Sequence, residues 1–130
     1  MSNHNAQDVN SVKQKGLIVF IKRSEHKTDL QGFAQGDYMT AREYANLLLS
    51  SLNDKNYSVY EHRVLYPNLL IIDQAEYLEH KTTTQEFLHQ TLQKRVADKK
   101  RTVIISEIDK DRLQGMICED LVDYLTTENT

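Results

Sequence analysis

Three short runs of consecutive apolar residues divide the chain into segments of alternating type. They lie at residues 17–21, 69–72 and 103–105. Because these runs are continuous rather than alternating with polar residues, they predict strands that are covered on both faces, as in a parallel sheet.

The segments between and after these runs carry apolar residues at helical spacing. A helix is predicted over residues 40–52, where Thr40 and Glu43 form a capping-box pair and the apolar side chains share one face. Two further helices are predicted over residues 84–96 and 111–125. Strands that alternate with helices predict an α/β fold with a parallel sheet and right-handed crossovers.

Length and composition indicate one ordinary globular domain. The chain has 130 residues, of which 39% are hydrophobic and 27% are charged, and these values exclude fibrous and wholly disordered classes. Residues 1–14 are polar and are expected to form a flexible tail, residues 15–125 the domain, and residues 126–130 a frayed end.

Net charge, the cysteine and histidine positions and the length of the apolar runs exclude further classes of protein. The net charge of −3 argues against a surface devoted as a whole to nucleic acid. Cys118 is the single cysteine, and the five histidines do not pair at the helical spacing of a zinc site. No run approaches the roughly 20 apolar residues of a membrane span, and the N-terminus lacks a signal-peptide core. We therefore expect a cytoplasmic protein.

Asp73 directly follows the apolar run at residues 69–72, and Gln74 follows Asp73. A carboxylate at the end of a buried parallel strand suits a magnesium ion that carries phosphate. The alternative from the residues alone is that Asp73 simply ends a buried strand, since apolar runs that end in Asp are frequent.

Three segments of the chain resemble one known family. Residues 38–52 (YMTAREYANLLLSSL) resemble the helix after its second strand, residues 68–92 (NLLIIDQAEYLEHKTTTQEFLHQTL) its Walker B strand and next helix, and residues 103–107 (VIISE) its sensor 1 strand. That family is the AAA+ ATPase domain of the bacterial replication initiator DnaA.

The resemblance implies a three-layer α/β fold of the P-loop NTPase type. Its parallel sheet would be truncated to about four strands, without the AAA+ lid. Asp73 would coordinate magnesium weakly through water, and Ser106 or Glu107 would sense a γ-phosphate. A bound nucleotide would contact the positions that match the family's motifs: Lys27, Thr28, Asp73, Gln74 and Ser106.

Departures from the family imply that its reaction has been lost. Residues 22–28 contain no glycine, although a phosphate loop needs glycines to wrap its backbone N–H groups around the phosphates. Gln74 stands where an acidic residue would polarise the attacking water. Residues 119–125 resemble an arginine-bearing segment of the family but contain no arginine. We expect a pseudo-ATPase without ATP or magnesium as cofactor, and a minimal ATPase using Lys27, Thr28 and Asp73 is the alternative.

The resemblance also suggests partners. The family's fifth strand would begin about where this chain ends, so residues 17–21 would form an open sheet edge that pairs with other chains, including a second copy. We expect an interaction module that regulates replication initiation by binding an initiator, a helicase-loading protein or itself.

Single-stranded DNA binding is a third interpretation. The family holds single strands in the region that here contains Tyr60 and Arg63. A second basic cluster comprises Lys94, Arg95, Lys99, Lys100 and Arg101. The simpler interpretations are tyrosines that pack on a core and a solvated helix end.

Overall fold

The structure is a computed structural model that describes residues 16–23 and 37–127. The tail predicted at residues 1–14 lies outside these ranges. The elements in chain order are β1 (Ile18–Lys22), β2 (Asp37–Thr40), α2 (Ala41–Asp54), α3 (Ser58–Tyr60), η2 (Glu61–Leu65), β3 (Leu69–Asp73), η3 (Ala75–Leu78), α4 (Thr82–Ala97), β4 (Arg101–Ser106), α5 (Lys110–Ile117), η4 (Val122–Tyr124) and β5 (Leu125–Thr127).

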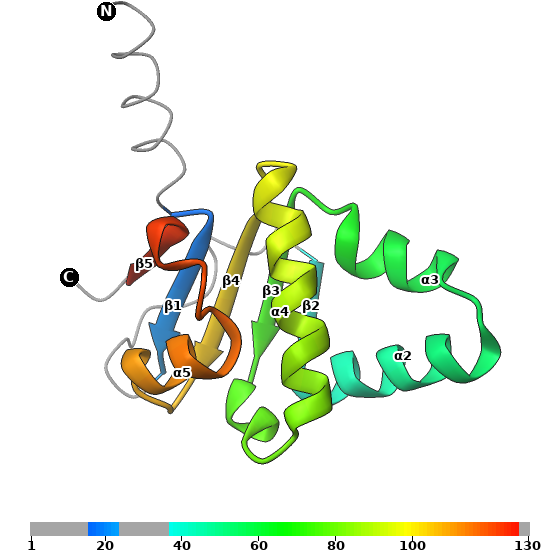
Figure 1. Cartoon of the computed structure of the whole chain (residues 1–130), viewed down its shortest axis with the longest axis horizontal. Coiled ribbons are helices and arrows are strands. Elements are labelled where there is room, and N and C mark those ends of the chain that lie inside the picture. Colours follow the sequence, from blue (N-terminus) through cyan, green and yellow to red (C-terminus); the bar gives the residue numbers. More distant parts are fainter. Residues whose placement is uncertain (1–15, 24–36, 128–130) are drawn as a thin grey trace, which may run out of the picture.

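The strands form one parallel sheet in the order β2-β3-β4-β1-β5 (Figure 1). The predicted α/β class and parallel sheet are confirmed, and the three apolar runs are β1, β3 and β4. The sheet has five strands rather than about four, since β2 and β5 are additional short strands at its edges.

The predicted open edge at β1 is wrong. β5 pairs in parallel with β1, placing Leu125 opposite Ile18 and Thr127 opposite Phe20. β1 is therefore an interior strand with neighbours on both sides, and pairing of two copies through its edge is ruled out. The predicted frayed end also begins too early, because Thr126 and Thr127 are strand residues.

The last predicted helix is shorter than its apolar pattern suggested, which leaves the following residues free to form β5. α5 ends at Ile117, and the chain then turns through η4 into β5. Leu121 is buried from a turn and Leu125 packs on the core from a strand, so neither continues the helix. The apolar residues at this four-residue spacing thus reach the core from a helix, a turn and a strand.

The predicted cap of α2 is confirmed. Thr40 is the N-cap, its hydroxyl accepts from the backbone N–H of Glu43 at 3.1 Å, and Glu43 accepts from the backbone N–H of Thr40 at 2.8 Å. This reciprocal pair satisfies backbone donors that the first turn cannot satisfy itself. It fixes where β2 ends and α2 begins.

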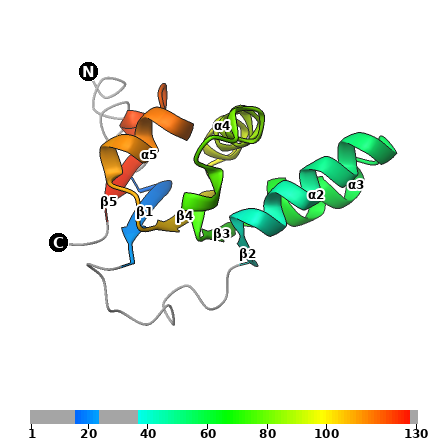
Figure 2. The same ribbon diagram turned by 90° about the horizontal axis from the view of Figure 1, so that it is seen from below.

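The main core lies between one sheet face and the helices. Figure 2 shows α4 and α5 above the same face, with α2 and α3 extending beyond the β2 edge. This cluster joins Ile18, Phe20, Leu70, Ile72 and Ile104 of the strands to buried residues of the helices. The opposite face contributes a smaller cluster of Val19, Ile21, Ile71, Val103 and Ile105. Among the described residues, no helix has the length and apolar character to cross a membrane.

Candidate functional site

The candidate site lies at the carboxyl ends of the central strands. Asp73 is the last residue of β3, and its side chain is only 3% exposed. Thr40 of β2 lies opposite Asp73 in the sheet register, and Ser106 ends β4 on the other side. Ligands of open parallel sheets bind outside this edge, so the location agrees with the sequence analysis.

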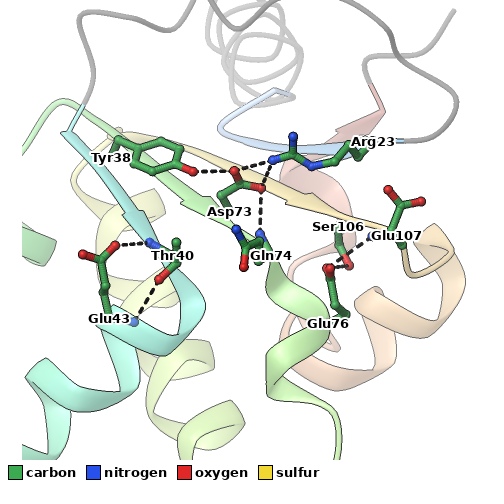
Figure 3. A network of polar contacts seen from close by, with 9 residues as sticks. All are labelled: Arg23, Tyr38, Thr40, Glu43, Asp73, Gln74, Glu76, Ser106 and Glu107. Atoms are coloured by element: carbon green, nitrogen blue, oxygen red, sulfur yellow. Dashed lines mark hydrogen bonds and ion pairs between the residues drawn. The ribbon is translucent and has the colours of Figure 1, made fainter.

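The Asp73 carboxylate is already held by other side chains (Figure 3). Arg23, which follows β1, donates to both carboxylate oxygens, and the hydroxyl of Tyr38 in β2 donates to one of them. The backbone N–H of Gln74 donates to the other oxygen at 2.7 Å. The carboxylate therefore has a cationic partner and three sources of hydrogen bonds before any ligand is considered.

These contacts set the protonation states of the site. Burial by itself would raise the pKa of Asp73, but the hydrogen bonds from Arg23, Tyr38 and the Gln74 backbone outweigh it and the pKa is lowered. Burial and the bond to Asp73 raise the pKa of Tyr38 to about 12. At neutral pH the site is thus an ionised carboxylate, a guanidinium and a protonated phenol.

Gln74 contacts the Asp73 carboxylate through its backbone N–H rather than through its side chain. It has left-handed backbone angles, with φ 56° and ψ 46°, and its side chain is exposed. This turn points its N–H at the Asp73 carboxylate and starts η3. A carboxamide at this position cannot accept a proton from water, as the sequence predicted.

Ser106 is engaged by Glu76 of η3. Its hydroxyl donates to Glu76 Oε1 at 3.2 Å and accepts from the backbone N–H of Ile108 at 2.9 Å. The backbone N–H of Glu107 lies 3.4 Å from the same Glu76 oxygen, whereas the Glu107 side chain is exposed. The predicted phosphate sensor therefore belongs to a local hydrogen-bond network (Figure 3).

Three of the five residues predicted to contact a nucleotide lie together in the structure. Asp73, Gln74 and Ser106 lie at one edge of the sheet, whereas Lys27 and Thr28 lie outside the described residues. Sequence reasoning missed Arg23, Tyr38 and Glu76. The only available signal was positional: Arg23 directly follows a strand whose carboxyl end meets that of β3.

The site is a poor fit for magnesium. Magnesium on a nucleotide commonly uses one or two protein carboxylates together with phosphates and water. Asp73 is such a carboxylate, but Arg23 already neutralises it and must be displaced first. No group of three or more His, Cys, Asp or Glu side chains in residues 16–23 and 37–127 could hold a metal ion.

Among the residues predicted to bind single-stranded DNA, the structure contradicts the role of Tyr60 and leaves those of Arg63, Lys99, Lys100 and Arg101 as predictions. Tyr60 is buried, and its hydroxyl bonds to Tyr44 and Thr91, so it cannot stack on a base. Lys100 donates to the carbonyl of Tyr66 at 2.6 Å, while Arg63 and Lys99 are exposed. Arg101 begins β4 with an exposed side chain.

Arg95 is fully buried rather than part of a solvated helix end. Its guanidinium donates to the carbonyls of Val64 and Pro67 at 2.8 Å and of Arg101 at 2.7 Å, and Nε donates to the Thr102 hydroxyl at 2.7 Å. Burial lowers the pKa of Arg95 to about 10. This side chain connects the end of η2 to the start of β4.

Comparison with known proteins identifies the family. Residues 19–126 match the family described as the bacterial DnaA ATPase domain. The chain belongs to this family. The match runs from β1 to β5 and so includes every strand of the DnaA-like sheet. No curated protein matches the chain in sequence.

Solved structures share the DnaA fold at low sequence identity. Domain III of Thermotoga maritima DnaA has a TM-score of 0.66 at 20% identity, covering 97% of this chain and 60% of that one. Aquifex aeolicus DnaA with AMPPCP has a TM-score of 0.63 at 14% identity, covering 95% and 43%. A DnaA bound to AMPPCP and single-stranded DNA has a TM-score of 0.63 at 14% identity, covering 88% and 41%. The chain thus spans less than two thirds of each of these structures.

Proposed function

We propose that this DnaA-family domain regulates replication initiation by binding a protein partner, and that it does not hydrolyse ATP. The observation that carries the proposal is the occupation of the Asp73 carboxylate by Arg23 and Tyr38. A buried carboxylate that is neutralised within its own chain is less available to a metal ion, because its cationic partner must be displaced before the metal binds.

The loss of hydrolysis has further support in the sequence. Phosphoryl transfer in this fold depends on a phosphate loop, a positioned magnesium and a residue that orients the attacking water. Residues 22–28 lack glycine, and Gln74 replaces the residue that would take up charge. Each departure weakens a different part of the reaction, so restoring one of them would not restore turnover.

We propose that a domain of this family that does not hydrolyse ATP acts by binding another protein. The five-stranded sheet forms although the hydrolytic motifs are altered, and several large apolar side chains are about half exposed. We propose an initiator or a helicase-loading protein as the partner, because the DnaA family acts at this stage. The role would be to occupy an interface without turning over nucleotide.

Phosphate release tests the enzymatic half of the proposal. The purified domain is incubated with ATP and magnesium, and its rate is compared with that of an Asp73→Asn variant that cannot hold the metal in the same way. We expect both rates to equal the background. Turnover by the native chain that disappears in Asp73→Asn would overturn the proposal and establish a minimal ATPase.

A binding experiment tests the other half. The immobilised domain is exposed separately to the purified full-length initiator and to the helicase-loading protein of the same cell. Saturable binding of either one is the expected result, and lack of retention of both would remove the proposed partners.

Single-stranded DNA is the second candidate, because one exposed aromatic group lies among basic side chains. Tyr66 is 51% exposed, its ring contacts His62 edge-on at 5.1 Å between centroids, and Lys100 lies 5.7 Å from its ring centroid. Bases stack on exposed aromatic rings beside cations. Anisotropy of a labelled oligonucleotide at several salt concentrations tests this, and the expected signature is binding that weakens with salt and with Tyr66→Ala.

A further inference from the structure

A cavity lies between α2, the segment of α3 and η2, and α4, away from the Asp73 site. Its volume is about 300 Å³, at the lower end of the range for small-molecule sites. Leu48, Leu52, Tyr57, Leu65 and Phe87 make most of its wall apolar or aromatic. Because an apolar cavity of about 150 Å³ already holds a benzene ring, this one has room for the side chain of a large apolar amino acid.

The buried hydroxyls of Tyr60 and Thr91 already have partners. Both residues line the cavity, and their hydroxyls bond to each other, while the Tyr60 hydroxyl also bonds to that of Tyr44 at 2.7 Å. An apolar group can therefore occupy this part of the cavity without leaving either hydroxyl unpaired.

Arg95 holds the η2 side of the cavity from behind. Leu65 lines the cavity, and the Arg95 guanidinium donates to the carbonyls of Val64 and Pro67 on either side of it, both at 2.8 Å. The same guanidinium donates to the carbonyl of Arg101 at the start of β4, at 2.7 Å. This wall is thus fixed to the sheet, which lowers the entropy lost when a ligand binds against it.

Two opposite charges lie on the wall of the same cavity. Glu61 comes from η2 and is half-buried, and Lys94 comes from α4 and is exposed. Neither forms an ion pair with the other or with any further residue in the part of the chain that the structure describes. Because the two charged groups are not in contact, a ligand that carries one cation and one anion can lie between them.

A zwitterion with an apolar arm satisfies both charges and the apolar wall. A simple anion would gain Lys94 but approach Glu61, and a simple cation would gain Glu61 but approach Lys94. A free apolar amino acid carries an ammonium, a carboxylate and an apolar side chain on one carbon atom, and its charge-assisted hydrogen bonds are stronger than neutral ones. An internal peptide segment lacks both charges, because its amine and carboxylate have become neutral amides.

We propose that this cavity binds a free apolar amino acid, with the side chain against Leu48 and Phe87, the ammonium at Glu61 and the carboxylate at Lys94. The charged head group lies toward the more exposed side of the cavity, so that the cost of burying a full charge is avoided. The site is separate from Asp73 and independent of the proposed function. It gives the domain a ligand that is neither a nucleotide nor a nucleic acid.

Amide chemical shifts of the isotopically labelled full chain, titrated with L-phenylalanine, test the proposal. We expect saturable shifts of the residues that line the cavity, with a dissociation constant of about 1 mM or below. Phenethylamine lacks the carboxylate and hydrocinnamate lacks the ammonium, so each should bind at least about tenfold more weakly. Equal affinity for all three compounds would show that apolar contact alone drives binding, and would overturn the proposal.

Two variants assign each charge of the ligand to its partner. Glu61→Gln should weaken binding of L-phenylalanine about tenfold without weakening that of hydrocinnamate, which has no ammonium. Lys94→Gln should weaken binding of L-phenylalanine by a similar factor without weakening that of phenethylamine, which has no carboxylate. A merely structural role of either residue would instead weaken all three compounds alike, and that result would contradict the assignment.

Matched controls separate these contacts from net charge and from folding. Glu86→Gln and Lys110→Gln remove the same charges at exposed positions outside the cavity, and neither should alter the affinity for L-phenylalanine. Circular dichroism checks that each variant folds. The absence of saturable shifts up to about 20 mM L-phenylalanine, or shifts confined to residues outside the cavity, would overturn the proposal.

Discussion

Replacing Arg23 with alanine would leave the Asp73 carboxylate buried with only Tyr38 and the Gln74 backbone as partners. Exposed ion pairs contribute about 0–1 kcal/mol, whereas removing one partner of a fully buried pair costs about 3–5 kcal/mol. The Asp73 side chain is 3% exposed but the Arg23 side chain is 48% exposed. Solvent therefore screens one half of the pair, and we expect a coupling energy of about 1–2 kcal/mol.

A double-mutant cycle measures that coupling directly. Urea unfolding at pH 7 is followed for the native chain, Arg23→Ala, Asp73→Ala and the double variant. A matched pair exists elsewhere in the chain, since Arg112 and Glu79 also form an arginine–carboxylate bridge but with side chains that are 62% and 27% exposed. That control cycle should give less than about 0.5 kcal/mol.

Equal coupling energies in the two cycles would refute the reasoning. They would mean that Arg23 neutralises Asp73 no better than one surface charge neutralises another. The Asp73 carboxylate would then be available to a metal ion, and the main support for a lost reaction would disappear.

Three further predictions concern Asp73, Arg95 and Thr40. Because the pKa of Asp73 is lowered on folding, its contribution is full above its unfolded pKa of about 4 and is lost as pH falls through the folded value. Urea unfolding between about pH 5 and pH 2 should show a steeper loss of stability in the native chain than in Asp73→Asn. Arg95→Ala should cost about 3 kcal/mol in the same assay at pH 7, because it leaves buried carbonyls unpaired, and Arg95→Lys should recover less than half of that loss. Thr40→Ala should cost about 1 kcal/mol through loss of the α2 cap, while Ser50→Ala on the exposed face of that helix should change stability by less than about 0.5 kcal/mol.

The sequence pattern located the interior of the sheet but not its edges. Continuous apolar runs identified β1, β3 and β4 because buried parallel strands need apolar residues on both faces. β2 and β5 are short and contain polar residues, such as Asp37 and Thr126, and nothing in their own sequences marks them as strands. They form because β1 and β3 offer backbone N–H and C=O groups for pairing. The sequence of β2 or β5 alone cannot show that these groups are available.

The candidate site was predictable in position but not in chemistry. Asp73 at the end of one apolar run and Ser106 at the end of another correctly located the site at the carboxyl ends of the strands. The partners of Asp73 come from residues 35 and 50 positions away, and only the folded arrangement selects them. Arg95 was misjudged for a related reason: basic residues near a helix end suggest solvent, but Arg95 shares the buried stripe of Leu92 and Val96.

Calorimetric titration of the native chain with ATP, with and without magnesium, tests the central claim most directly. If Arg23 has taken the place of the metal at Asp73, the titration should show no saturable heat and magnesium should make no difference. Saturable binding at micromolar ATP that requires magnesium and is abolished by Asp73→Asn would contradict the account, since it would show that the carboxylate still serves a nucleotide.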